Sequence, residues 1–311
     1  MMTERKDQIA GGLWGLLIGD ALGVSYEFTP PTGIPPLDQI EMTPPAGFRR
    51  TYPNIAPGTW SDDGAQALCL LASLLDCKQV DPEDLGRRLL DWYQRGYMAI
   101  ANHVFDVGNH TSRVLGAIAN GTPILEAGAI NPDAKGNGSL MRVLPLVLWH
   151  QGSDAELVEA AHLQSRASHG AITCQVCCAL YCLWARCVLN GDDSPWASAV
   201  ATLRRLYSPG SPYRQDLEDT VCPDAPPHGE GTGYVVDCLH SARYALTCPT
   251  YEMVVKRAIA LGNDTDTTAC VAGGIAGLRD GAAAIPQRWH DQILGQEIVE
   301  PLLDRLLQRW S

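Results

Sequence analysis

The chain has 311 residues, of which 46% are hydrophobic and 19% charged, an ordinary balance for a globular protein with a large buried core. Its formal net charge is −12, from 35 acidic and 23 basic residues. An acidic chain lacks the basic face that a sequence-independent grip on nucleic acid requires, so we expect no nucleic-acid partner. A phosphate-bearing ligand would need metal cations or backbone N–H groups to offset the repulsion.

The N-terminal segment is predicted to form a helix with a glycine at every fourth position. The glycines are Gly11, Gly15, Gly19 and Gly23. Because glycine lowers helix stability, this stripe indicates that another backbone packs closely against it. The apolar run 9–19 makes a poor signal peptide, since acidic residues precede it and Asp20 follows at once. No segment approaches the ~20 apolar residues of a membrane span, so we expect a cytoplasmic protein without one.

Apolar residues recur at intervals of three and four along most of the chain, which is typical of helices. The segments are 64–77, 84–95, 112–120, 140–151, 154–164, 170–190, 234–246, 251–261 and 267–278. Alternating strand patterns are nearly absent, and neither an internal repeat nor a clear linker is visible. The sequence therefore predicts an all-α protein with a single domain over residues 1–311.

The eleven cysteines favour neither a disulfide framework nor a zinc site. Five of them fall in the segment 170–190, where Cys174, Cys178 and Cys182 share one helical stripe. Cys174 and Cys177 have the Cys-x-x-Cys spacing that zinc sites use, but the sequence has no second such pair to complete four ligands. We expect these thiols to be reduced and buried, as in a cytoplasmic protein.

Two long segments without helical periodicity are candidates for a lid or a partner surface. Residues 29–58 carry eight prolines, and residues 207–233 mix proline, glycine and acidic residues. Structureless segments of this length are uncommon in compact proteins unless they are functional or disordered.

Two acidic segments carry the strongest signal for chemistry. They are Ser61-Asp62-Asp63, ahead of the helix 64–77, and Asp264-Thr265-Asp266-Thr267, ahead of the helix 267–278. Either segment alone fits an ordinary helix cap, since serine and aspartate favour helix N-termini. Together they offer carboxylate and hydroxyl oxygens, which are ligands for Mg²⁺ or Mn²⁺ rather than zinc. Paired ions of this kind can clamp phosphate or ribose oxygens and orient water.

These segments resemble the two metal-binding motifs of the ADP-ribosylglycohydrolase family, which includes the dinitrogenase reductase-activating glycohydrolases. The family's motifs read Thr/Ser-Asp-Asp-Thr and Gly-x-Asp-x-Asp-Thr. Further similar segments follow in the family's order: GDALGVSYEF (19–28), FDVGNHT (105–111), GNGSLMR (136–142), Ser168-His169 and GTGYVVD (231–237). One departure is Gly64, which stands where the first motif has its second threonine. The lost hydroxyl could loosen metal affinity.

The resemblance implies a compact orthogonal helix bundle whose cleft holds two divalent cations, Mg²⁺ or Mn²⁺. The implied metal ligands are Ser61, Asp62, Asp63, Asp264, Asp266 and Thr267. The implied catalytic residues are Glu27, Asp62 and Asp106. The implied contacts to ADP-ribose are Gly108, Gly136, Asn137, Gly138, Ser139, Met141, His169 and Tyr234. Each also has an ordinary interpretation, such as a solvated acid, a core histidine or a buried aromatic residue.

The glycine loop 136–139 is predicted to lie just before a helix that begins near Leu140. Glycines at a helix N-terminus present several backbone N–H groups, which could bind the diphosphate of ADP-ribose. The alternative interpretation is a glycine-rich helix cap without a ligand.

The implied activity is metal-dependent removal of ADP-ribose from a modified protein side chain, arginine being the commonest target among similar family members. Water oriented by the cations would attack the ribose C1″ carbon, and ADP-ribose would be the product. One alternative is a hydrolase of another ADP-ribosyl linkage. Another is an immunity-type binding protein that occludes or counteracts an ADP-ribosyltransferase, with residues 207–233 as a partner surface. Intact acids in both motifs argue against a catalytically silent relative.

Overall fold

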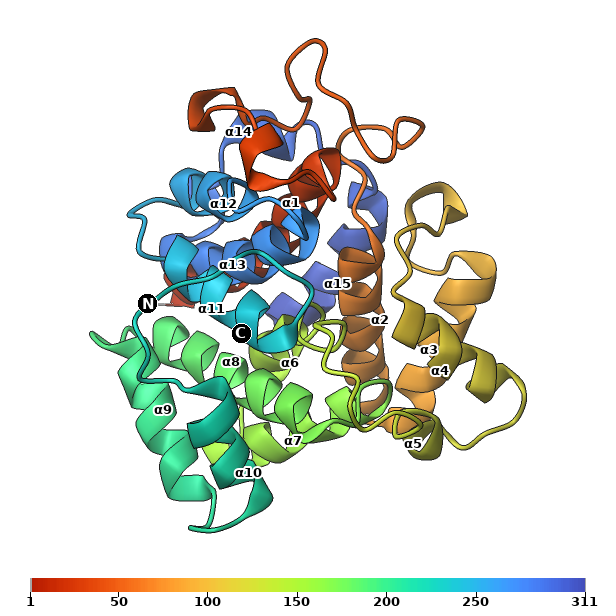
Figure 1. The fold of residues 1–311 in the computed structure, drawn as a ribbon, viewed down its shortest axis with the longest axis vertical. Helices are drawn as coiled ribbons and strands as arrows, with labels where there is room; N and C mark the ends of the chain where they lie inside the picture. Colours follow the sequence, from red (N-terminus) through yellow and green to blue (C-terminus); the bar gives the residue numbers. More distant parts are fainter. Residues whose placement is uncertain (1, 311) are drawn as a thin grey trace.

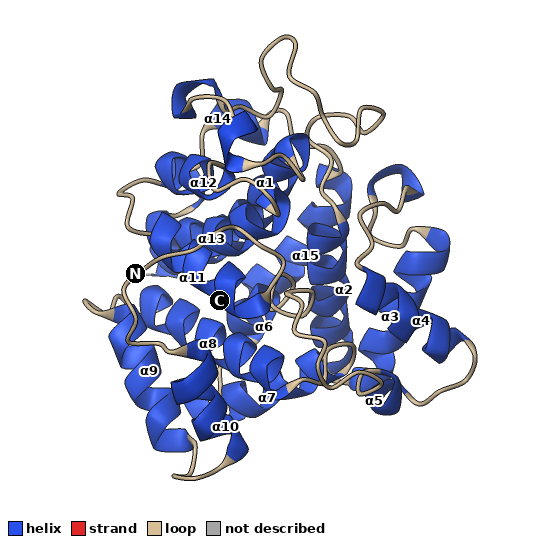
Figure 2. Cartoon of the chain, viewed as in Figure 1, coloured by secondary structure: helices blue, strands red, loops and turns tan. Residues whose placement is uncertain are grey.

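A computed structural model describes residues 2–310, with side chains from residue 4 onward. Within this range every regular element is helical, as Figure 2 shows, and the β-type pairing is limited to an isolated antiparallel bridge between Gly136 and Tyr234. The prediction of an all-α protein is confirmed. One cluster of buried apolar side chains extends from Ile9 near the N-terminus to Leu306 in the last helix.

Fifteen α-helices follow one another along the described chain. They are α1 (Met2–Gly23), α2 (Asp62–Cys77), α3 (Pro82–Arg95), α4 (Asn109–Ala119), α5 (Ile124–Ala127), α6 (Leu144–Trp149), α7 (Asp154–Arg166), α8 (Ile172–Leu189), α9 (Pro195–Leu206), α10 (Pro212–Asp216), α11 (Val235–Ala245), α12 (Tyr251–Ile259), α13 (Thr265–Asp280), α14 (Gln287–His290) and α15 (Gln296–Gln308). Short 3₁₀ turns lie at Val24–Tyr26, Pro31–Gly33, Leu37–Gln39, Ile100–Asn102 and Ala282–Ala284.

Helix α1 packs against α13 along the predicted glycine stripe. Figure 1 shows the two helices side by side, with α2 beside them and α3, α4 and α5 beyond α2. A Cβ atom on Gly11, Gly15 or Gly19 would lie 2.3, 2.5 or 2.2 Å from a backbone oxygen of α13. Such distances are far below van der Waals contact, so a larger residue would force the helices apart. The close backbone approach inferred from the stripe is confirmed.

Two helices are long and apolar enough to cross a membrane by length and composition, which differs from the expectation drawn from the sequence. They are Glu4–Tyr26 and Ile172–Leu189, and 94% and 78% of their most apolar windows are buried within the protein. Core helices of globular proteins meet the same criterion. In α8 the cysteines of the predicted stripe, Cys174, Cys178 and Cys182, are fully buried.

The segment 140–151 does not form the predicted continuous helix. Residues 138–142 form turns, and α6 begins at Leu144 with Pro145 in its first turn. Proline is common in the first turn of a helix, where the backbone N–H groups have no intrahelical acceptor, and it is disfavoured further inside. Pro145 therefore sets the start of α6. The expectation that the glycine loop opens a helix near Leu140 is wrong.

The two irregular segments differ from each other. Residues 207–233 contain α10 and a π-helical turn, Leu217–Val221, so the first half of this segment is packed rather than structureless. Arg204 holds it in place, with ion pairs to Glu218 at 2.7 Å and Asp224 at 2.5 Å. Residues 29–58 contain only two 3₁₀ turns and run over the outside of the molecule before reaching α2.

Candidate active site

The N-termini of α2 and α13 meet in one cleft. Ser61 caps α2, since its hydroxyl accepts a hydrogen bond from the Asp63 N–H at 3.3 Å. Asp264 precedes α13 but makes no such side-chain cap. The Thr267 hydroxyl donates to Oδ1 of Asp63 at 3.3 Å, although the two residues are 204 positions apart. The two acidic segments therefore converge in space, which no local pattern in the sequence could establish.

A cavity of about 350 Å³ lies where these helices meet. Twelve of the residues expected to function line it: Glu27, Asp62, Asp63, Asp106, Gly108, Gly136, Asn137, Gly138, Met141, His169, Asp264 and Thr267. Four others do not contribute to its lining: Ser61, Ser139, Tyr234 and Asp266. No lysine or arginine is among the described side chains that line the cavity, so its wall is acidic.

Glu27 joins the second acidic segment directly. It follows the 3₁₀ turn Val24–Tyr26, is 1% exposed, and its Oε2 atom accepts from the N–H groups of Thr265 at 3.0 Å and Asp266 at 3.2 Å. These N–H groups belong to the first turn of α13, where the helix leaves donors without intrahelical partners. Glu27 thus supplies the cap that Asp264 does not, and its carboxylate is fixed beside the cleft.

The carboxylates form a set that could hold a metal ion. Within the described residues, Glu27, Asp264 and Asp266 are the one group of three His, Cys, Asp or Glu side chains whose ligand atoms lie within 4.8 Å of one another. The Oδ2 atoms of Asp63 and Asp266 are buried without a hydrogen-bond donor. Buried polar atoms ordinarily have partners, and bound divalent cations are partners that carboxylate oxygens of this kind accept.

Electrostatics supports the same interpretation. Burial raises the pKa of Asp62, Asp63 and Asp266 well above the usual range, and repulsion by neighbouring carboxylates raises it further. Acids in such a cluster can all ionise only when positive charge joins them. The oxygen-only ligand set fits a hard cation.

Asp106 is held by a residue that the sequence did not single out. The Tyr52 hydroxyl donates to Oδ1 of Asp106 at 2.6 Å, and the neighbouring Thr51 hydroxyl donates to the Glu27 carbonyl at 2.6 Å. Both donors lie in the proline-rich segment 29–58. That segment therefore positions two of the predicted catalytic residues, a role different from the lid or partner surface considered for it.

Asp20 is a second residue that the sequence left without a role. It is fully buried on α1 and accepts from the N–H groups of Ser61 at 2.9 Å and Gly64 at 2.7 Å. Burial raises its pKa to about 7, although these hydrogen bonds lower it. A Cβ atom on Gly64 would lie 2.9 Å from Oδ2 of Asp20 and 2.8 Å from the Trp60 ring. Glycine at this position therefore fits the carboxylate that holds the start of α2.

The substrate residues expected in the glycine loop occupy different surroundings. Asn137 donates to Oδ2 of Asp264 at 2.8 Å, which ties the loop to the acidic cluster. Ser139 points away from the cavity and bonds to Ser165 at 2.8 Å. His169 lies against the loop, and a Cβ atom on Gly138 would come within 2.7 Å of its ring. Tyr234 is 40% exposed at the start of α11.

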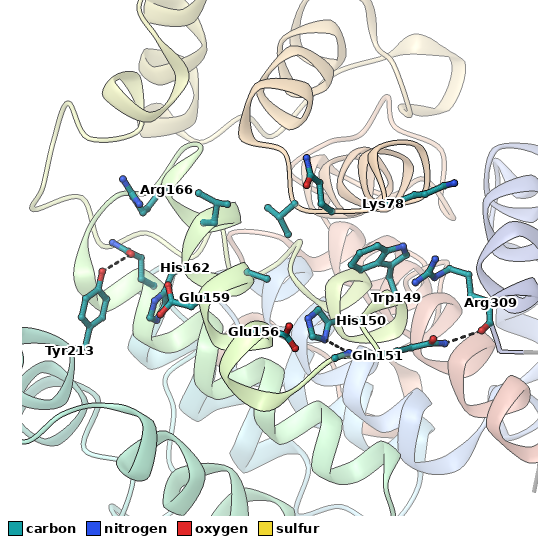
Figure 3. Close-up of a pocket in the computed structure, with 16 residues that line it drawn as sticks. Lys78, Trp149, His150, Gln151, Glu156, Glu159, His162, Arg166, Tyr213 and Arg309 are labelled. Atoms are coloured by element: carbon teal, nitrogen blue, oxygen red, sulfur yellow. Dashed lines mark hydrogen bonds between the residues drawn. The ribbon is translucent and has the colours of Figure 1, made fainter.

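A larger cavity, about 530 Å³, shares no lining residue with the acidic cleft. Figure 3 shows its mixed wall, with Lys78 and Arg309 at one end, Glu156 in the middle, and Glu159, Arg166 and Tyr213 toward the other end. The wall mixes both signs of charge and lacks the convergence of like ligand groups seen in the acidic cleft.

These observations define an all-helical protein with an oxygen-rich acidic cleft at two facing helix N-termini. The family model described as ADP-ribosylglycohydrolase matches residues 1–311. The chain belongs to the ADP-ribosylglycohydrolase family, whose members are hydrolytic enzymes. The family resemblance inferred from the motifs is confirmed.

Relatives of this chain match along nearly its whole length. It is 29% identical to an ADP-ribosylarginine hydrolase of Pseudomonas putida, over 98% of this chain and 79% of that protein. It is 26% identical to the ADP-ribosyl-[dinitrogen reductase] glycohydrolase of Rhodospirillum rubrum, over 92% and 90% of the two chains. A solved structure titled "ADP-ribosylglycohydrolase-related protein complex" superposes with a TM-score of 0.77 at 30% identity, covering 99% of this chain and all of that one.

Proposed function

We propose that this protein is a metal-dependent hydrolase that removes ADP-ribose from an ADP-ribosylated protein, with N-linked arginine as the modified side chain. The observation that carries the proposal is the convergence of Glu27 with the two acidic segments in one cavity. Two relatives that match 98% of the chain are named ADP-ribosylarginine hydrolases, which supports arginine as the target.

We propose two divalent cations, Mg²⁺ or Mn²⁺, held by Ser61, Asp62, Asp63, Asp264, Asp266 and Thr267, and the oxygen-only ligand set supports hard cations of this kind. When bound, such cations would offset the acidic wall, chelate ribose or phosphate oxygens and lower the pKa of water. Ser61 and Asp266 do not line the cavity, so they would reach the cations from buried positions behind its lining, at the starts of the two helices.

The side chains around the cleft divide the remaining work. Cleavage at C1″ leaves a side-chain nitrogen that needs a proton or charge stabilisation. Glu27 lies beside the cleft with its carboxylate fixed by the first turn of α13, and it is the acid that we assign to this task. Asp106, fixed by Tyr52, is placed to orient the ribose or the departing group. Asn137 and the glycine loop face the cavity where backbone N–H groups can meet phosphate oxygens.

The proposal is tested with arginine-, serine- and aspartate-linked ADP-ribosyl proteins, each with and without a chelator. We expect release of ADP-ribose from the arginine linkage in Mn²⁺ or Mg²⁺ and none after chelation. Asp62→Ala should abolish turnover and Mn²⁺ binding, and Glu27→Gln should lower turnover about 100-fold. Full activity after complete metal removal would overturn the mechanism, and release only from another linkage would overturn the substrate.

The same assay separates the enzyme from the binding-protein alternative. A protein that only occludes an ADP-ribosyltransferase would protect the target without releasing ADP-ribose, and Asp62→Ala would leave that protection intact. An enzyme loses protection and release together in this variant.

A further inference from the structure

The structure assigns Arg142 as a positioning residue that fixes both the acidic cluster and the glycine loop through two buried glutamines. Arg142 is the last residue of the GNGSLMR segment and is fully buried between the loop and α2. Neither it nor the two glutamines lines the cavity. Its effect on the cleft therefore has to pass through other side chains.

The guanidinium of Arg142 is held entirely by neutral acceptors. Its Nη1 donates to Oε1 of Gln66 at 3.0 Å and to the Gly138 carbonyl at 3.3 Å. Its Nε donates to Oε1 of Gln164 at 3.2 Å, and its Nη2 donates to the Gln164 carbonyl at 3.0 Å. No described carboxylate forms an ion pair with this buried cation. Burying a charge in this way is costly, so these four hydrogen bonds have to offset the lost hydration of the guanidinium.

Gln66 connects Arg142 to the acidic cluster, because its amide bonds to Arg142 on one side and to Asp62 on the other. An arginine side chain can only donate, so it takes the carbonyl oxygen of the Gln66 amide and turns the NH₂ group the other way. That NH₂ group donates to Oδ2 of Asp62 at 3.1 Å, one helical turn earlier on α2. Gln66 thereby fixes the rotation of Asp62, which lines the cavity.

Gln164 connects Arg142 to the glycine loop in the same way, through the two ends of its amide. Arg142 takes Oε1 of Gln164, and the NH₂ group of Gln164 donates to the Ser139 carbonyl at 3.2 Å. Together with the direct bond to Gly138, this anchors two successive loop carbonyls from below. These bonds fix the conformation of the loop, of which Gly136, Asn137 and Gly138 line the cavity. The Leu140 N–H is already used within the loop, since it donates to the Asn137 carbonyl at 2.7 Å.

The contact through Gln66 and the contact through Gln164 can be tested separately, because the first reaches a proposed metal ligand and the second reaches the glycine loop. Gln66→Met should weaken Mn²⁺ binding about tenfold, as loss of a partner to a metal ligand typically does, and leave ADP-ribose binding within about twofold. Gln164→Met should weaken ADP-ribose binding about tenfold and leave Mn²⁺ binding within about twofold. Arg142→Lys keeps the positive charge but loses the planar guanidinium that reaches both glutamines, so it should weaken the binding of both Mn²⁺ and ADP-ribose.

The binding constants are measured by calorimetry, with Mn²⁺ alone and then with ADP-ribose at saturating Mn²⁺. The triple variant Gln66→Met, Gln164→Met, Arg142→Met keeps the experiment decisive if a single variant does not fold, because it removes the buried charge together with both glutamine amides. Only Oδ2 of Asp62 and the carbonyls of residues 138, 139 and 164 lose a donor. The variant should remain folded at the temperature of the calorimetry yet bind both ligands about tenfold more weakly. The control is Gln296→Met, whose amide bonds only to carbonyls of residues 290 and 293, and it should change neither constant.

The expected effect on ADP-ribose binding rests on the proposed function, whereas the expected effect on Mn²⁺ binding does not. If the wild type binds no ADP-ribose, the proposed function fails, and the role of Gln66 is then judged from Mn²⁺ binding alone. If the wild type binds both ligands and the triple variant binds them equally well, the positioning role of Arg142 is wrong. Equal weakening of both ligands by each glutamine variant would also overturn it, since that indicates general loosening of the fold.

Discussion

Asp106 takes a left-handed backbone conformation, φ 54°, and depends on a single hydroxyl from a distant segment. Tyr52→Phe removes that donor and leaves the aromatic packing of the ring against Phe28 and Phe105. Because a hydrogen bond to a carboxylate is worth about 1.5–3 kcal/mol, we expect turnover to fall at least about tenfold. Mn²⁺ affinity should stay unchanged, since Tyr52 contacts none of the proposed ligands.

Steady-state kinetics on an ADP-ribosylated protein, paired with Mn²⁺ calorimetry, checks this expectation. Tyr244→Phe is a matched control, because its hydroxyl accepts from Arg257 outside the cleft. Wild-type turnover in Tyr52→Phe would remove Asp106 from the group of residues that act on the substrate.

The pairing of α1 with α13 gives a prediction about whole elements. In Gly19→Ala the new Cβ would meet the Ala269 carbonyl oxygen at 2.2 Å, and neither backbone can yield without moving a helix. We expect the free energy of unfolding to fall by about 1–3 kcal/mol and Mn²⁺ binding to weaken, because α13 begins at the acidic cluster. Urea denaturation and calorimetry measure the two effects.

Gly116 provides the matched comparison. It lies inside α4, and a Cβ atom there would meet nothing within 4 Å. Gly116→Ala should therefore stabilise the protein by about 0.5–1 kcal/mol through helix propensity alone. A loss of stability in this variant as large as in Gly19→Ala would mean that the glycine stripe has no special role.

Elements with a clear apolar face were predictable from the sequence. The segments 64–77, 170–190 and 267–278 correspond closely to α2, α8 and α13, since each has regular periodicity and a distinct start. The segment 140–151 is apolar at nearly every position from Leu140 to Trp149, so its periodicity could not reveal the turns before Pro145. Helix α5 has only four residues, too few for a periodic signal.

The site was predictable where a residue belongs to a motif and not where it acts through contacts. The two acidic segments and Glu27 were identified by resemblance, and the structure places them together. The sequence did not identify Asp20, Tyr52 or Arg142, because no spacing rule connects them to their partners. Asp20 lies 41 positions from Ser61 and Tyr52 lies 54 positions from Asp106. Arg142 lies 22 and 76 positions from its two glutamines. Tertiary packing alone brings these residues to the cleft.

At the scale of the whole molecule, buried histidines link stability to pH. His162 is 6% exposed, stacks on Tyr213 and bonds to the Tyr207 hydroxyl at 2.7 Å. Burial lowers its pKa from 6.5 to about 4, so the unfolded chain takes up this proton first. The contribution to stability is complete above pH 6.5 and is lost as the pH falls from 6.5 to 4.

We expect this one histidine to account for a loss of about 2 kcal/mol between pH 7 and pH 5. His162→Gln keeps a hydrogen-bonding group near Tyr207 without a titration in this range, so the variant should lose less stability over the same interval. Urea denaturation at the two pH values measures both slopes. Equal slopes in the two proteins would show that His162 is protonated in the folded state at pH 5.

The contact between Glu27 and α13 has a consequence for biosynthesis. These groups are 238 residues apart in the sequence: Glu27 follows the 3₁₀ turn after α1, and Thr265 begins α13. A nascent chain emerging from the ribosome cannot complete the cleft until residues 265–280 have been made, and closing so long a loop slows folding. A truncated translation product ending before residue 264 would carry Glu27, Asp62 and Asp63 without their partners. The acidic cluster therefore forms only after the start of α13 has been synthesised.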